Sequence, residues 1–183
     1  MRYLSLIGVA LMGLSGCIGA GSVTALEQPA PGYMPRMSGI DLLGEDRRIP
    51  ESLQGDLNIV TFAFEREQQE QVNTWINMLD NLLQENPDIR YYEIPLIYEM
   101  SALGRSWVNN GMRSGIPSEK ARERTITVYT DREKFFEMMN MSKDYIYTLL
   151  VDDAGKIYWR AQGVANDMHL KDLNEAIADA QKE

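Results

Sequence analysis

The residues Asn58-Ile-Val-Thr-Phe-Ala-Phe64 run directly into Glu65-Arg-Glu-Gln-Gln-Glu-Gln71, and this junction decides the fold. The first segment is apolar on both faces of an extended chain, as expected for a central strand that helices cover on each side. The second segment is polar and opens a helix that we expect to end at Asn86-Pro87. Its apolar residues recur at spacings of three and four and form one stripe: Val72, Trp75, Ile76, Leu79, Leu82 and Leu83.

The remaining segments alternate between strand and helix patterns. Apolar or β-branched runs predict strands at 40–43, 48–50, 89–97, 125–129, 144–151 and 156–161, with turn residues between the paired ones. Helices are predicted over 101–112, over a segment that contains Phe135 and Phe136, and over a last segment capped by Asn166 or Asp167. Residues 111–120 are expected to be irregular.

Three details of these elements can be tested by a structure. Pro95 is expected to confine the pairing of its strand to the first half. Leu103, Trp107 and Val108 are the apolar positions of the helix over 101–112. Thr130 and Glu133 have the spacing of a capping box.

Length and charge limit the class of protein. The chain has 183 residues and a formal net charge of -9, which fits one domain with an acidic surface. Nucleic acid is an unsuitable partner, because phosphate binding requires a dense basic surface.

The N-terminus has the pattern of an export signal. Met1-Arg2 give a positive start, and residues 3–14 form an apolar run that is too short to span a bilayer. Leu14-Ser15-Gly16-Cys17 then resembles the lipobox of bacterial lipoproteins, in which the signal peptidase cuts before a cysteine that carries diacylglycerol. The alternatives are an uncleaved anchor and an ordinary secretory signal.

This resemblance implies export to the cell envelope and excludes thiol chemistry. Cys17 is the only cysteine, so its lipidation leaves no thiol for catalysis, disulfide formation or metal ligation. We expect a signal peptide over 1–16, the lipidated cysteine and a flexible tether over 17–38, and a folded domain over 39–183. Ile18 after the cysteine implies the outer membrane more than the inner one, with the domain facing the periplasm.

The order of elements resembles the thioredoxin-like superfamily, in the branch of membrane-tethered thioredoxin-like and peroxiredoxin-like proteins. Ser52-Leu53-Gln54-Gly55-Asp56 is similar to the entry into that family's active strand, and Val151-Asp152-Asp153-Ala154-Gly155-Lys156-Ile157 is similar to its final hairpin. The resemblance implies an α/β three-layer sandwich with a central mixed sheet, helices on both faces, and an inserted helix and strand after the second core strand.

A second likeness lies in the last part of the chain. Tyr145 to Asp152 and Ile157 to Gly163 resemble the mitochondrial assembly factor of the ATP synthase membrane sector, which has this fold. We carry over from it only the expectation of a non-redox thioredoxin fold that works in assembly.

Two departures from the thioredoxin pattern bear on activity. The family's Cys-x-x-Cys maps to 67–71, where this chain has no cysteine, and Glu65 and Glu67 there suit the first turn of a helix. Tyr147 stands where the family has a cis-proline, and a non-proline residue favours a trans bond. Tyr147 then either lines a binding surface or packs inside.

Other chemical signals are few. Basic residues gather in the inserted segment, at Arg105, Arg113, Lys120, Arg122 and Arg124, and form either a docking surface for an acidic partner or anionic head groups or a solvated loop. His169 is expected to be a solvated surface histidine. We predict no metal and no cofactor.

Two functions follow from these patterns. The first is a membrane-anchored, periplasm-facing lipoprotein whose non-redox domain binds a protein partner of unknown identity. Its candidate binding surface comprises Glu65, Arg66, Glu67, Tyr147, Arg113, Arg122 and Arg124. The alternative is a non-thiol enzyme with Glu65 or Glu67 as general base and Arg66 as anion clamp.

Overall fold

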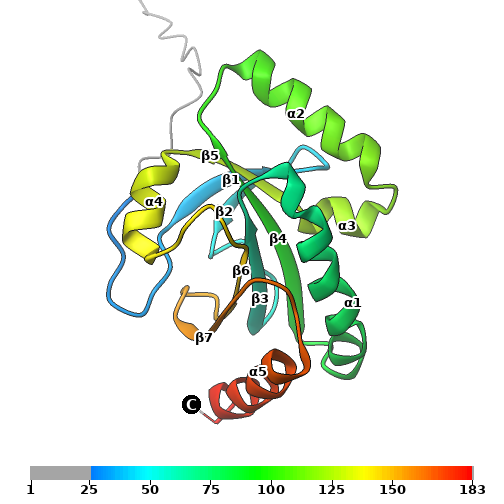
Figure 1. The fold of residues 1–183 in the computed structure, drawn as a ribbon, viewed down its shortest axis with the longest axis vertical. Coiled ribbons are helices and arrows are strands. Elements are labelled where there is room, and N and C mark those ends of the chain that lie inside the picture. The colour runs from blue at the N-terminus through cyan, green and yellow to red at the C-terminus, as the bar shows by residue number, and fades with distance from the viewer. Residues whose placement is uncertain (1–25, 183) are drawn as a thin grey trace, which may run out of the picture.

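The computed structural model describes residues 26–182, which form one seven-stranded sheet with helices on both faces (Figure 1). The strands are β1 (Met37–Asp41), β2 (Asp46–Ile49), β3 (Leu57–Ala63), β4 (Ile89–Tyr98), β5 (Ile126–Thr130), β6 (Tyr147–Val151) and β7 (Ile157–Gln162). The helices are η1 (Arg66–Gln68), α1 (Gln69–Glu85), α2 (Ala102–Gly115), α3 (Glu119–Arg124), α4 (Arg132–Met139) and α5 (Asp167–Ala180). The predicted α/β class is confirmed.

The sheet is mixed, in the order β2-β1-β5-β4-β3-β6-β7. β3 lies inside it, parallel to β4 and antiparallel to β6, with Val60 opposite both Tyr92 and Leu149. β4 and β5 are also parallel, so the carboxyl ends of β3, β4 and β5 meet at one end of the sheet.

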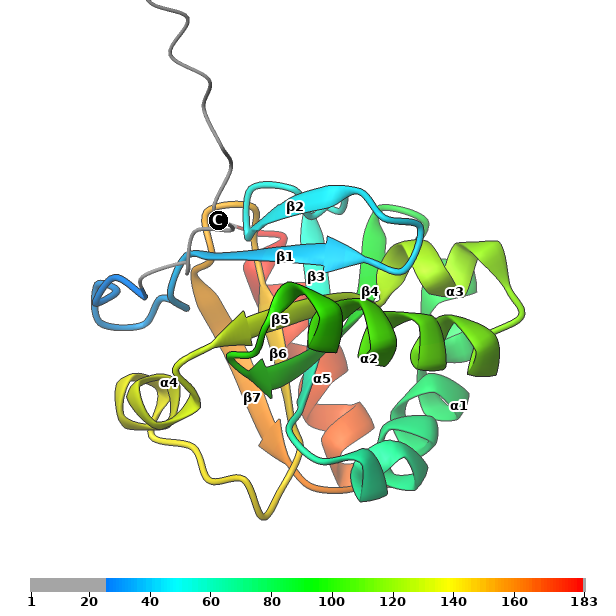
Figure 2. The same ribbon diagram turned by 90° about the horizontal axis from the view of Figure 1, so that it is seen from above.

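Each face of the sheet has its own apolar core. On one face, α4 packs Phe135 and Phe136 against side chains such as Phe62. On the other, α1 and α5 bury Trp75 and Leu173. Figures 1 and 2 show α4 on the opposite side of the sheet from α1 and α5, which gives the three expected layers.

The packed chain begins earlier than the expected boundary at residue 39. Leu26, Met34 and Met37 are buried in the α4 core, and the Lys134 Nζ donates to the Leu26 carbonyl at 2.6 Å. More than half of the expected tether, from Leu26 onward, is therefore part of the fold, because its scattered apolar residues supply core contacts. The predicted signal peptide and Cys17 lie outside the described residues.

The structure corrects the expected effect of Pro95. β4 pairs with β3 as far as Ala63 opposite Pro95, and from Leu96 onward it pairs with β5. Pro95 thus lies where the strand changes partner, and both halves of β4 are paired.

The inserted segment is more helical than predicted. Residues 111–120 were expected to be irregular, but α2 extends to Gly115, and Ser118 caps α3 through a 3.3 Å bond from the Ala121 amide. The cap of α4 is Asp131, whose carboxylate accepts from the Lys134 amide at 3.1 Å, so the predicted capping box at Thr130 is wrong by one residue.

Two of the three apolar positions of α2 face outward, against expectation, and the third, Val108, is half-buried. Leu103 is 85% exposed and Trp107 is 80% exposed, and α2 buries none of its residues. Polar contacts hold the helix instead: the Tyr129 hydroxyl donates to Asn109 Oδ1 at 2.7 Å, and the Arg113 Nε donates to the Leu42 carbonyl at 2.7 Å. Within residues 26–182, no helix combines the length and the apolar character that crossing a membrane requires.

Candidate functional site

The junction after β3 lies at the end of the sheet where β3, β4 and β5 finish. Glu65 keeps an extended backbone, and η1 then leads into α1. Glu65, Arg66 and Glu67 are all exposed. The structure therefore places these three residues of the candidate binding surface together, in water, at the start of the helix.

Gln68 closes this junction from the inside. Its Oε1 accepts from the Phe64 amide at 2.8 Å and from the Glu65 amide at 3.1 Å, and its Nε2 donates to the Lys143 carbonyl at 2.7 Å. Lys143 belongs to the loop that leads into β6, so one buried amide joins the strand end, the helix start and this loop. The place that the thioredoxin pattern gives to reactive thiols is filled by a satisfied hydrogen-bonding group.

Arg132 forms the second contact that fixes the junction. It is 3% exposed, and its Nη2 lies 2.9 Å from Glu65 Oε1. Its guanidinium lies 4.2 Å from the centre of the Tyr98 ring, with Phe136 and Phe64 on its other sides at 5.5 and 5.8 Å. The aromatic faces and the carboxylate together compensate a charge that burial would otherwise disfavour.

A hydrogen bond ties Tyr98 to the first turn of α4. The Tyr98 hydroxyl donates to Glu133 Oε1 at 3.0 Å, and this bond, with some burial, raises the pKa of Tyr98. The hydrogen bond to Glu133 helps to hold the Tyr98 ring over Arg132.

A buried carboxyl group lies on the α1 face of β4, near the same end of the sheet. Glu93 is opposite Thr61 on β3 and forms a bridge to Thr125 before β5. Burial raises its pKa to about 7, and a hydrogen bond with Gln69 in the first turn of α1 acts in the opposite direction. Glu93 did not stand out in the sequence, because its strand reads as an ordinary apolar run.

Tyr147 does not belong to an open surface. It is 3% exposed, its hydroxyl accepts from the Ser142 amide at 3.0 Å, and the Arg160 guanidinium lies 4.7 Å from its ring centre. Alternation along β6 turns it toward Phe64 in the α4 core. Within residues 26–182 the cis peptide bond precedes Pro50, so Tyr147 has the expected trans peptide.

An open groove of about 520 Å³ lies beside the junction. Its lining comes from α1, the loop before β6, the end of β7 and the start of α5: Gln71, Asp144, Tyr145, Gln162, Gly163, Val164, Asn166 and His169. The Trp75 Nε1 donates to the Gly163 carbonyl at 2.9 Å, and the Thr74 hydroxyl accepts from the Ala165 amide at 2.9 Å. Helix α1 thus holds one wall of the groove in place.

His169 is not the solvated histidine that we expected. Its ring is stacked on Trp75 with 5.5 Å between centroids and 13° between planes, and its Nδ1 is buried. The sequence placed His169 correctly in the first turn of α5 but could not show that this turn faces α1. No group of histidine, cysteine or acidic residues within 26–182 is arranged to hold a metal ion.

Four of the five basic residues of the inserted segment lie at the other end of the sheet, whereas Arg105 lies near the carboxyl end of β5, with its guanidinium 5.5 Å from the centre of the Tyr129 ring. The Arg113 Nε is bonded to the Leu42 carbonyl and the Arg122 Nε to the Ile116 carbonyl at 2.6 Å, so both guanidinium groups stabilise loops. Arg124 lines a separate hollow near the start of β4. The candidate binding surface predicted from the sequence is therefore divided between two opposite ends of the sheet.

Comparisons with known proteins agree with this architecture. The thioredoxin domain of a thiol-disulfide oxidoreductase from Bacteroides vulgatus matches with a TM-score of 0.51 and 16% identity, over 81% of this chain and 98% of that one. BsSco, of the Sco family of cytochrome c oxidase assembly proteins, matches with a TM-score of 0.52 and 15% identity, over 82% and 96%. An exposed lipoprotein thioredoxin from Streptococcus pneumoniae matches with a TM-score of 0.50 and 15% identity, over 76% and 98%.

These structural matches establish a thioredoxin-like fold. A comparison with curated protein sequences finds no significant match. The family model described as ATP10 protein matches residues 25–179, which agrees with the likeness in the last part of the sequence. This match spans nearly all of the described structure, and the chain belongs to the ATP10 protein family.

Proposed function

We propose that this protein is a lipid-anchored, periplasm-facing module that binds a protein partner during assembly of a membrane complex. The observation that carries the proposal is an open groove beside a junction whose polar groups are already bonded to one another. Gln68, in the segment to which the family's Cys-x-x-Cys maps, is bonded to its neighbours, and Glu65 beside it is paired with Arg132, so the polar groups of the junction are already compensated.

The edges of the groove expose apolar side chains that suit a protein partner. Tyr145 is 47% exposed, Val164 is 50% exposed, and Met168 just beyond the groove is 71% exposed. Aromatic and methionine side chains are enriched in protein interfaces. The exposed Trp107 on α2 offers a second contact of the same kind.

The geometry does not favour catalysis by Glu65 or Glu67. A general base needs a raised pKa, which a dry pocket provides, whereas both carboxylates are exposed and Glu65 is paired with Arg132. Arg66 is exposed beside them and makes no described contact with either.

The relatives suggest the class of partner. The chain belongs to the ATP10 protein family, and BsSco belongs to a family of cytochrome c oxidase assembly proteins. A subunit of a membrane complex is thus the partner that we propose.

The start of the packed chain limits where an anchored domain would sit. Nine residue steps separate Cys17 from Leu26, so a lipid on Cys17 would lie within about 30 Å of Leu26. Leu26 is held by Lys134 of α4, so a lipid on Cys17 would keep this part of the domain within that distance of the membrane surface.

Photocrosslinking in whole cells tests the binding proposal. A benzophenone amino acid would replace Tyr145 at the groove, Trp107 on α2, or Lys171 on the outer side of α5 as the control. We expect Tyr145 to crosslink to one integral membrane protein, which mass spectrometry would identify, and Lys171 to give no such product. Identical products at all three positions would contradict a specific surface.

Lipidation is tested separately. Radiolabelled palmitate should enter the protein and be absent from the Cys17→Ala variant. Label that persists in this variant would refute the anchor and leave the groove experiment unaffected.

A further inference from the structure

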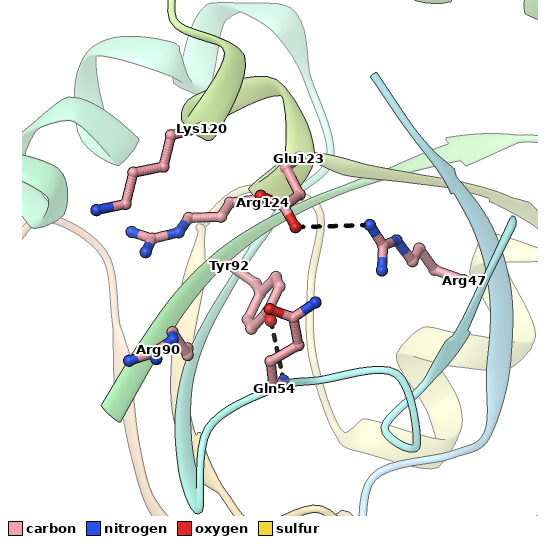
Figure 3. Close-up of a pocket in the computed structure, with 7 residues that line it drawn as sticks. All are labelled: Arg47, Gln54, Arg90, Tyr92, Lys120, Glu123 and Arg124. Atoms are coloured by element: carbon pink, nitrogen blue, oxygen red, sulfur yellow. Dashed lines mark hydrogen bonds and ion pairs between the residues drawn. The ribbon is translucent and has the colours of Figure 1, made fainter. Parts of the chain in front are cut away.

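A hollow with basic walls lies at the end of the sheet where β3 and β4 begin (Figure 3), and it shares no lining residue with the groove. We call it the basic hollow. Its lining comes from β2, the loop before β3, the start of β4, and α3: Arg47, Gln54, Arg90, Tyr92, Lys120, Glu123 and Arg124.

The lining carries four cations and one carboxylate in a chain with a net charge of -9. Arg47 is already compensated, because its Nε and Nη2 each lie 2.8 Å from Oδ2 of the buried Asp41, and its Nη2 is 3.9 Å from Glu123. Arg90, Lys120 and Arg124 have no carboxylate within salt-bridge distance among residues 26–182. The hollow therefore has an excess of positive charge that the described protein does not neutralise.

These three cations without a carboxylate partner line the same hollow. Figure 3 shows Lys120, Arg124 and Arg90 on one side of Tyr92, and the Arg47–Glu123 pair on the other. Arg90 also donates to the Pro87 and Ile89 carbonyls, which fixes its guanidinium near the start of β4. Guanidinium groups suit oxyanions because their donors match two oxygens at once.

Tyr92 supplies a neutral donor beside the cations. Its hydroxyl accepts from the Gln54 amide at 3.0 Å, which leaves the hydroxyl proton for another acceptor. Burial raises the pKa of Tyr92, with Arg124 and Arg47 acting in the opposite direction, so the phenol keeps its proton at neutral pH.

The loop before β3 is built to hold this arrangement. The Gly55 amide donates to Asn58 Oδ1 at 3.0 Å, and Asn58 Nδ2 donates to the Gly55 carbonyl at 2.8 Å. A Cβ at Gly55 would lie 2.4 Å from the Leu57 carbonyl oxygen and 2.9 Å from the Arg90 amide. Glycine thus permits the close approach that sets Gln54 beside Arg90.

We propose that the basic hollow binds a phosphate group, carried either by a free phosphate or by the phosphomonoester head group of a lipid. Its volume of about 60 Å³ is enough for one such group. Three unneutralised cations and a phenol donor fit the charge and the acceptor oxygens of this ligand. The site is independent of the groove, and its ligand does not depend on which partner the groove binds.

Isothermal titration calorimetry on the purified full-length chain tests the proposal with two probes. The first is inorganic phosphate against chloride at matched ionic strength, and the second is dihexanoylphosphatidic acid below its critical micelle concentration. The test variant is Lys120→Gln with Arg124→Gln, which leaves Arg47 and its buried partner intact. Lys171→Gln on α5 is the control for the change of charge, and circular dichroism checks that each variant is folded.

We expect binding of at least one probe, weakened about tenfold or more in the double variant and unchanged in Lys171→Gln. Binding of both probes assigns the site to any phosphate, and binding of the second alone assigns it to a lipid head group. The absence of binding up to about 10 mM, or a loss below about threefold in the double variant, overturns the proposal. Should the double variant fail to fold, Lys120→Gln alone gives the same comparison at an exposed position.

Discussion

Glu93 gives the most quantitative prediction, because it is a buried carboxyl group whose pKa burial raises to about 7 from an ordinary value of 4.5. The residues around it on the α1 face are uncharged. Thr61 lies opposite it on β3, Gln69 of α1 is hydrogen-bonded to it, and Tyr91, two residues earlier on β4, is buried. The perturbation is Glu93→Gln, which keeps the shape and hydrogen-bonding capacity of the protonated carboxyl group and removes its titration.

The magnitude follows from linkage between protonation and folding. Between pH 4.5 and 7 the native state holds a proton that the unfolded state has lost, so the wild-type protein loses stability as pH rises through this window. A difference of about 2.5 pKa units corresponds to about 3 kcal/mol of unfolding free energy, fully lost above pH 7 and fully present below pH 4.5.

Urea unfolding of both proteins from pH 4 to pH 8 measures this difference. We expect Glu93→Gln to match the wild type near pH 4 and to exceed it by up to about 3 kcal/mol at pH 8. Glu67→Gln, at an exposed carboxylate, is the control and should follow the wild type across the range. A constant offset between the Glu93→Gln and wild-type curves, independent of pH, would refute the reasoning.

Two further predictions concern the junction and the tryptophans. Glu65→Gln should lower the unfolding free energy by about 2 kcal/mol, because it leaves the buried Arg132 charge without its carboxylate. Equilibrium denaturation at neutral pH measures this loss. An unchanged midpoint would show that the aromatic rings alone stabilise the Arg132 charge. Trp75→Ala should cost about 3–5 kcal/mol, since it empties a fully buried site and removes the bond to Gly163. Trp107→Ala should change stability by less than about 0.5 kcal/mol, and equal losses for the two tryptophans in thermal melts would contradict the outward orientation of α2.

The central part of the fold could be predicted because its patterns are local and redundant. The apolar run of β3 predicts a strand that is buried on both faces, and the three-and-four spacing of α1 predicts a helix that is buried on one face. Trp75 and Leu79 are fully buried, as this spacing requires. Ile76 is 41% exposed, because the stripe on α1 is wider than the area that the sheet and α5 cover.

The predictions of an unpacked tether and of a buried apolar face on α2 are wrong for the same physical reason. An amphipathic or scattered apolar pattern predicts that side chains can be buried, but which surface they meet depends on contacts distant in sequence. Met34 and Met37 pack in the α4 core. Leu103 and Trp107 stay exposed, because α2 is held through Tyr129 and Arg113 on its polar side.

The site was predicted only in outline. The sequence located the junction and its lack of thiols, yet Gln68 and Arg132 looked like ordinary polar residues at helix starts. A helix-capping aspartate followed by an arginine, with two phenylalanines three and four residues later, is a weak signal for an arginine enclosed by aromatic rings. Its partner Glu65 lies 67 residues away, and only the fold brings the two together.

The lack of a thiol at the junction changes how such a protein can hold a partner. A disulfide-exchange protein can keep its substrate through a covalent bond, whereas this domain would depend on the apolar area that binding removes from water. Leu103 and Trp107 are the most exposed large apolar residues described, and covering both would contribute about 2–3 kcal/mol each. Part of this gain would be offset by the translational and rotational freedom that the two proteins lose on binding. An apolar helix face left outward would therefore suit the proposed module, which would retain its partner by noncovalent contacts.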